Sequence, residues 1–133
     1  MPDLVFLDSN VIFSAAYRTT TVLRQLWSLP DLMLLSSAYA IGEAERNLPP
    51  TRHADLQILL KAIAVVPADP HEDRPLPPAL VLPAKDVPIF RAATAAGATH
   101  LLTGDRQHFG AYFGQRFEDV LILPPRTYLL SRL

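Results

Sequence analysis

Five short apolar runs alternate along the chain with longer segments of helical spacing. The runs cover residues 4–7, 32–35, 63–66, 100–103 and 120–123, and the fourth has a histidine and a threonine at its two ends. Continuous apolar runs of this length are typical of strands that are buried on both faces of a sheet. Strands that alternate with helices favour a parallel sheet with helices on both sides. We therefore expect an α/β fold, a three-layer sandwich around a central five-stranded parallel sheet.

The segments between these runs predict helices and one long loop. Helices are expected over 11–17, 21–29, 38–48, 54–62 and 88–96, with a final helical turn or two from 125. Ser9 and Asn10 can cap the first helix, and Ser36 and Ser37 the third. Residues 67–88 hold seven of the 13 prolines, which predicts a loop with little regular structure. Loops this long are often functional lids or rims.

Length and composition indicate one globular domain, residues 1–133. Half of the residues are hydrophobic, 19% are charged, and there is no cysteine, which excludes disulfides and thiolate metal sites. No apolar run is long enough to cross a bilayer, and the N-terminal segment lacks the basic region of a signal peptide, so we expect a cytoplasmic protein with no membrane partner. A net charge of −1 does not indicate a broad basic surface. Any RNA would therefore be held locally.

Four acidic residues fall where a parallel sheet gathers functional groups. Asp8 ends the first apolar run, Asp105 follows the fourth, Asp86 begins the helix before it, and Glu43 lies on a helix of small residues. Each acid alone is explained as a helix cap or a solvated charge. Together, at the carboxyl ends of the strands, they would repel one another unless cations held them. Carboxylates without histidine or cysteine favour Mg²⁺ or Mn²⁺, which can drive phosphodiester hydrolysis.

Three stretches resemble the PIN domain family. They are LDSNVIFSAAYR at 7–18, SSAYAIGEAERNL at 36–48 and KDVPIFRAATAAGATHLLTGDRQHF at 85–109. The match is closest to the bacterial branch of toxin components of type II toxin–antitoxin pairs. The resemblance implies a divalent-metal-dependent endoribonuclease that cuts single-stranded RNA. It assigns Asp8, Glu43 and Asp86 as the core acids and Asp105 as the fourth, and all four as catalytic metal ligands.

Several assignments stay open at this point. Glu45 lies two residues after Glu43, and helical periodicity alone does not choose between the two, although family spacing favours Glu43. Asp105 is either a direct metal ligand or a support for one. His108 could contact a phosphate or move a proton, but a lone histidine beside a phenylalanine is more often a packing residue, so it is left out of the catalytic set.

Five further residues are expected near the acids. Three of them, Ser9, Asn10 and Thr103, could orient a carboxylate or bind a water molecule, although helix capping explains Ser9 and Asn10 equally well. Two basic residues, Arg18 and Arg106, could contact substrate phosphates. A solvated surface charge explains these arginines about as well.

The expected partners follow from the same resemblance. They are single-stranded or structured RNA, a cognate antitoxin protein and a second copy of the chain, to whose interface the apolar 128–130 segment could contribute. The rival hypothesis is a PIN-fold interaction module with weak catalysis that acts by binding a partner. The four acids argue against this rival, because a module without catalysis need not keep a repulsive acid cluster.

Overall fold

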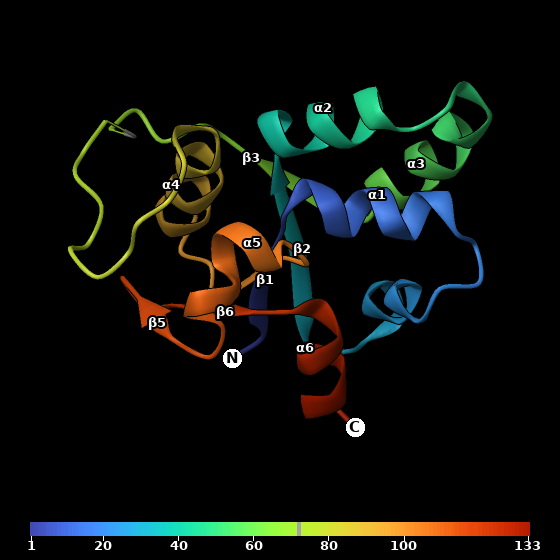
Figure 1. The fold of residues 1–133 in the computed structure, drawn as a ribbon. Helices are drawn as coiled ribbons and strands as arrows, with labels where there is room; N and C mark the ends of the chain where they lie inside the picture. The colour runs from blue at the N-terminus through green and yellow to red at the C-terminus, as the bar shows by residue number, and fades with distance from the viewer. Residues whose placement is uncertain (72) are drawn as a thin grey trace.

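A six-stranded sheet runs through the centre of the computed structural model, in the strand order β3-β2-β1-β4-β6-β5 (Figure 1). The structure describes residues 1–71 and 73–133; residue 72, within the predicted loop, lies outside them. The strands are β1 (Asp3–Leu7), β2 (Leu32–Ser37), β3 (Ile63–Val66), β4 (His100–Leu102), β5 (Arg116–Phe117) and β6 (Val120–Leu123). All five predicted strands are present, and their pairings are parallel. The α/β fold class is confirmed.

Helices pack on both faces of this sheet. They are α1 (Ser9–Tyr17), α2 (Ala38–Asn47), α3 (His53–Leu60), α4 (Val87–Ala95), α5 (Arg106–Phe109) and α6 (Pro125–Ser131), with four short 3-10 helices, η1 (Val22–Ser28), η2 (Pro50–Arg52), η3 (Ala84–Asp86) and η4 (Gly110–Tyr112). Side chains alternate across β1: Val5 and Leu7 join a core with α1, α3 and α6, whereas Phe6 joins a core with α4 and α5. This arrangement gives the three predicted layers.

The predicted count of five strands is wrong by one. β5 pairs antiparallel with β6 through a two-residue turn. The turn residues Glu118 and Asp119 both have positive φ, 48° and 69°. Two positive φ angles are the mark of a type I′ hairpin, which asparagine or aspartate followed by glycine usually signals. The pair Glu-Asp is not such a signal, so the sequence pattern did not predict this hairpin.

Two expectations for the N-terminal helices also need correction. α1 begins at Ser9, and its N-cap is Asp8 rather than Ser9 or Asn10, because the Asp8 carboxylate accepts a hydrogen bond from the Ser9 backbone N–H. The helix predicted over 21–29 is instead a 3-10 helix, which the Thr21 hydroxyl caps. The predicted cap of α2 is correct at Ser37, whose hydroxyl accepts a hydrogen bond from the Ala40 N–H.

The proline-rich segment is anchored to the body of the protein by a buried arginine. Apart from residue 72, it runs from β3 to η3 without regular helix or strand, as predicted. Arg91 of α4 is 1% exposed; it donates to the Pro75 carbonyl at 2.6 Å and to both carboxylate oxygens of Glu118 at 2.9 and 3.1 Å. One side chain therefore ties the loop to the β5–β6 turn.

The C-terminal helix belongs mostly to the core. Tyr128 and Leu129 are buried, and only Leu130 of the segment proposed for a dimer interface is exposed. The Tyr128 hydroxyl donates to the Asp3 carboxylate at 2.7 Å, which joins α6 to β1. Among the described residues, no helix is long and apolar enough to cross a membrane.

Candidate metal and active site

Asp8 lies at the carboxyl end of β1, and neighbouring side chains fix its orientation. Its backbone N–H continues the sheet pairing by donating to the Leu102 carbonyl at 3.0 Å. Its carboxylate accepts from the Thr103 hydroxyl at 2.8 Å, from the Asn10 amide at 3.1 Å and from the Ser9 N–H at 2.7 Å. The predicted supporting residues thus surround Asp8, although Ser9 acts through its backbone.

Asn10 also holds the loop that carries the fourth acid. Its side-chain oxygen accepts a hydrogen bond from the Gly104 N–H at 2.7 Å. A Cβ at position 104 would lie 3.3 Å from that oxygen, which is tight enough to push the two groups apart. The Thr103 hydroxyl accepts from the Asp105 N–H at 3.1 Å. Asp8 and Asp105 are therefore linked through shared polar partners.

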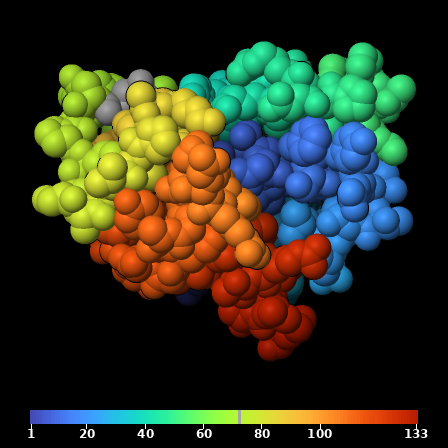
Figure 2. Space-filling model, viewed as in Figure 1, coloured from blue at the N-terminus to red at the C-terminus, as the bar shows by residue number. Residues whose placement is uncertain are grey.

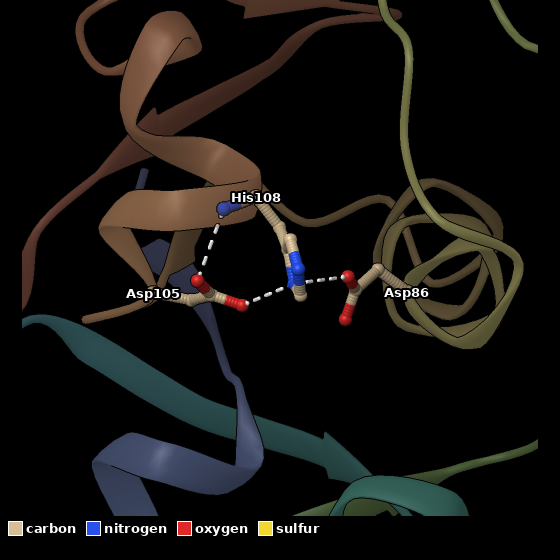
Figure 3. A group of neighbouring side chains, drawn as sticks. All are labelled: Asp86, Asp105 and His108. Atoms are coloured by element: carbon tan, nitrogen blue, oxygen red, sulfur yellow. Dashed lines mark hydrogen bonds and ion pairs between the residues drawn. The ribbon is translucent and has the colours of Figure 1, made fainter.

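Asp86, Asp105 and His108 form the closest group of metal-ligating side chains in the described part of the chain (Figure 3). Asp86 lies at the start of α4, and the other two lie at the start and in the middle of α5. The Nδ1 of His108 is 3.0 Å from Asp86 Oδ2 and 2.8 Å from Asp105 Oδ2. In Figure 3 the imidazole ring stands between the two carboxylates. His108, which the sequence interpretation set aside, therefore contacts two of the predicted acids.

The contact between His108 and Asp86 is close but poorly directed. His108 Nδ1 and Asp86 Oδ2 are both buried, and neither has a hydrogen bond of acceptable geometry. We regard the contact as an ion pair that forms when the imidazole is protonated, because the distances are short and the angles are unfavourable. Buried polar atoms without a hydrogen bond usually have a functional or ligand-binding reason. Both atoms face the space between the acids.

Burial raises the pKa of Asp8 to about 6, against the opposing effect of its hydrogen bonds from Thr103 and Ser9. The negative charges of Asp86 and Glu43 raise it further. Burial also raises the pKa of Asp86, which the charge of His108 lowers and that of Asp105 raises. The charges of Asp86 and Glu43 raise the pKa of Asp8, and the charge of Asp105 raises that of Asp86. The four acids are therefore electrostatically coupled.

Glu43 and Glu45 differ in their surroundings. Glu43 is half-buried on α2 and is close enough to affect the pKa of Asp8 and of Tyr39. Glu45 is exposed and contributes to neither. The Tyr39 hydroxyl donates to the Lys85 carbonyl at 2.7 Å, which joins α2 to the residue before Asp86. The geometry therefore favours Glu43 as the acid that α2 contributes.

The residues present suit a hard divalent cation. Four carboxylates from four parts of the chain meet at one end of the sheet, and two of them are buried with raised pKa values. A cation would relieve this mutual repulsion, and oxygen donors select Mg²⁺ or Mn²⁺ over softer metals. Asp86 Oδ2 is buried without a well-directed hydrogen bond, and a cation would take the place of its contact with His108 Nδ1.

Arg18 and Arg106 lie together, beside the acids rather than among them. Both line a cavity of about 570 Å³ between α1, η1, α5 and α6. A neighbouring cavity of about 370 Å³ is lined by Asn10 and Asp105, and the two cavities share Ser14 and Gly104 among their walls. The open space therefore continues from the arginines to the fourth acid.

The comparisons with known proteins bear on the fold. No protein-family model and no curated protein matches the chain. Among solved structures, the chain is similar to VapBC2 from Rickettsia felis bound to a DNA fragment from its promoter, with 14% identity, a TM-score of 0.64, and coverage of 91% of this chain and 98% of that one. It is also similar to Mycobacterium tuberculosis VapC20, a sarcin-ricin loop cleaving toxin, with 15% identity and a TM-score of 0.53. This match covers 80% of this chain and 94% of that one. The expected resemblance is thus confirmed at the level of the fold.

Proposed function

We propose that the protein is a divalent-metal-dependent endoribonuclease that hydrolyses phosphodiester bonds of single-stranded RNA. The observation that carries this proposal is the meeting of four electrostatically coupled carboxylates, Asp8, Glu43, Asp86 and Asp105, at one end of a parallel sheet. Their mutual repulsion and their carboxylate oxygens call for a hard cation. The fold, shared with VapBC2 and with the toxin VapC20, supports the same interpretation.

Each residue has a distinct part in the proposed reaction. Asp8, Glu43 and Asp86 would hold Mg²⁺ or Mn²⁺, with Asp105 as a fourth ligand or as the support of one. The bound cation would polarise the phosphodiester and activate a water molecule. Thr103 and Asn10 hold the Asp8 carboxylate in one orientation. His108 can carry a proton close to Asp86 and Asp105.

The test is cleavage of a labelled single-stranded RNA by the full chain with Mn²⁺, with EDTA, and by the Asp8→Asn variant. We expect cleavage with Mn²⁺ only, and a loss on the order of a hundredfold or more in the variant, as for other groups that stabilise charge in a transition state. Cleavage that neither EDTA nor Asp8→Asn alters would disprove the nuclease proposal. A chain that binds a protein partner but never cuts RNA would favour the rival interaction module.

The biological role that we propose is the toxin of a toxin–antitoxin pair. It is supported by the fold shared with VapBC2 and VapC20 and by the motif resemblance. An antitoxin protein would then be a partner, and cellular RNA as substrate would place the protein in the cytoplasm. Expression of the chain should arrest growth, and co-expression of the product of an adjacent small gene should relieve the arrest. Growth without arrest would leave a ribonuclease with another role.

A further inference from the structure

Three arginines from separate elements line the cavity beside the acids. Arg18 follows the end of α1, Arg106 is the first residue of α5, and Arg126 lies in the first turn of α6. In Figure 2 the blue surface of α1, the orange surface of α5 and the red surface of the C-terminal segment border one another on one face. The fold therefore brings three cations from distant parts of the sequence to one cavity.

No carboxylate of the described residues lies within ion-pair distance of these three arginines. Other arginines are paired, for example Arg74 with Asp69 and Arg91 with Glu118. Three exposed positive charges around a cavity of about 570 Å³ leave a local excess of positive charge in a chain of net charge −1. Arginine is well suited to phosphate because its planar guanidinium donates in a fixed, bidentate geometry.

An aromatic pair lies in the same wall. The rings of Phe13 and Tyr17 stack with centroids 5.4 Å apart and an interplanar angle of 14°. Both line the cavity, and Tyr17 is 43% exposed. Aromatic faces beside arginines are the combination that holds single-stranded nucleic acids, since bases stack on the rings while the cations follow the phosphates.

The cavity near the far end of the acid cluster has a different character. It is lined by Tyr39, Val65 and Val66, together with other uncharged residues from the start of α2, the end of β3 and α4. It offers no cation to a phosphate. Lys85 and Arg46 lie close enough to affect the pKa of Asp86 and of Tyr39, but neither lines this cavity. Of the two cavities, only the one beside Asp105 is therefore lined by arginines.

Resting on the proposed function, we propose that the cavity of Arg18, Arg106 and Arg126 binds the phosphates of single-stranded RNA on one side of the cleaved bond. Tyr17 supplies a face on which one base stacks. Arg126, on the C-terminal helix, is a phosphate ligand that no motif indicated. RNA is favoured over an acidic protein segment because the exposed ring of Tyr17 beside the arginines offers a stacking face for a base, which a glutamate side chain cannot use.

The experiment measures RNA affinity without cleavage. The full chain carries Asp8→Asn and is kept in EDTA, and fluorescence anisotropy follows its binding to a labelled single-stranded RNA of about 12 nucleotides, a length typical of such binding sites. Arg126→Ala is compared with Arg116→Ala, an exposed arginine on β5 that does not line the cavity. Thermal melting verifies that both variants fold.

We expect Arg126→Ala to weaken RNA binding about fivefold or more. The plot of log affinity against log salt should become less steep by about 0.7, the value for one lost single-strand phosphate contact. Arg126→Lys should keep the slope. Tyr17→Ala should weaken binding without changing the slope, because stacking involves no counterions. Arg116→Ala should stay within about twofold, since an isolated surface charge acts weakly at ordinary salt.

Equal effects of Arg126→Ala and Arg116→Ala would overturn the proposal. So would a polyglutamate peptide that binds as tightly as the RNA and depends on Arg126, because the cavity would then be a site for an acidic protein segment. Since the assay needs neither metal nor catalysis, a failure of the nuclease proposal does not decide its outcome. Conversely, metal-dependent cleavage with RNA affinity unaffected by Arg126→Ala would overturn this inference alone.

Discussion

The Thr103 hydroxyl donates a hydrogen bond of 2.8 Å to the Asp8 carboxylate across 95 residues of sequence. Asp8 follows β1, and Thr103 follows β4, the strand beside it. Parallel pairing brings the two carboxyl ends together, and the buried hydrogen bond holds the acid in one rotamer. A buried carboxylate with a pKa of about 6 is nevertheless costly to ionise. The site therefore carries a stability cost that a cation would offset.

The Asp8→Asn variant tests this cost. A carboxyl whose folded pKa is raised from 3.8 to about 6 binds its proton more tightly in the folded state, so metal-free wild type loses stability as pH rises from about 4 to about 6. The loss is on the order of 2–3 kcal/mol and persists at higher pH. Asp8→Asn should remove this contribution to the pH dependence, leaving the one from the raised pKa of Asp86, and should be more stable than wild type at pH 7 in EDTA. Urea unfolding at a series of pH values measures the pH dependence and the difference in unfolding free energy between the two proteins. A variant less stable than wild type at pH 7 would contradict this prediction.

Glu43→Gln and Glu45→Gln form a matched pair on α2. Glu43 is half-buried beside Asp8, whereas Glu45 is exposed to solvent. Glu43→Gln should reduce Mn²⁺-dependent RNA cleavage by about a hundredfold, comparable to the loss of other charge-stabilising groups. Glu45→Gln should leave the initial rate within about twofold, as expected for a surface charge. The opposite ranking in a cleavage time course would assign the ligand to Glu45.

Most of the sheet was predictable because its signals are local. Each strand of the parallel core is a short apolar run, and Asp8, Asp86 and Asp105 directly follow such a run or begin a helix. The β5–β6 hairpin was not predictable, because its turn, Glu118-Asp119, lacks the Asn-Gly or Asp-Gly pair that usually signals a type I′ turn.

The acids and the polar residues around Asp8 were predictable from the sequence, but the other contacts of the site were not. Helical periodicity could not choose between Glu43 and Glu45, because burial of a side chain depends on the elements packed around it. His108 is three residues after Asp105, a spacing that places two side chains on the same face of a helix, and this was the available signal for its contact with Asp105. Its contact with Asp86 depends on how α4 and α5 pack, and no sequence motif predicts that packing.

Divalent metal should displace the contact between His108 and the two acids. The Nδ1 atom lies within 3.0 Å of oxygens of both Asp86 and Asp105. A cation bound to these oxygens would repel a protonated imidazole and change its surroundings. Adding Mg²⁺ at neutral pH should shift the imidazole NMR signals of His108. Those of His53, whose Nε2 contacts the Leu48 carbonyl, should stay unchanged. Unshifted His108 signals at saturating Mg²⁺ would contradict the proposed ligands.

Arg91→Leu should loosen the proline-rich segment. The substitution leaves the Pro75 carbonyl without its donor and Glu118 without its ion pair. Because Arg91 is buried and Glu118 is partly exposed, we expect a loss of about 2–3 kcal/mol of unfolding free energy, less than for a fully buried pair. Glu118→Gln keeps an acceptor oxygen and should cost less than about 1 kcal/mol. Urea unfolding compares the two, and limited proteolysis near Pro75 should accelerate only in Arg91→Leu. Equal stabilities would show that this anchor is unimportant.

Anomalous diffraction from a manganese-soaked crystal would show which carboxylates hold the metal. We expect a manganese peak at the carboxyl ends of β1 and β4, coordinated by oxygens of Asp8 and Asp86, with Glu43 and Asp105 completing or supporting the shell. The peak should disappear from a crystal of Asp86→Asn grown and soaked in the same way. A well-ordered crystal with no peak at these carboxylates, or a peak held only by other residues, would contradict the proposed metal site.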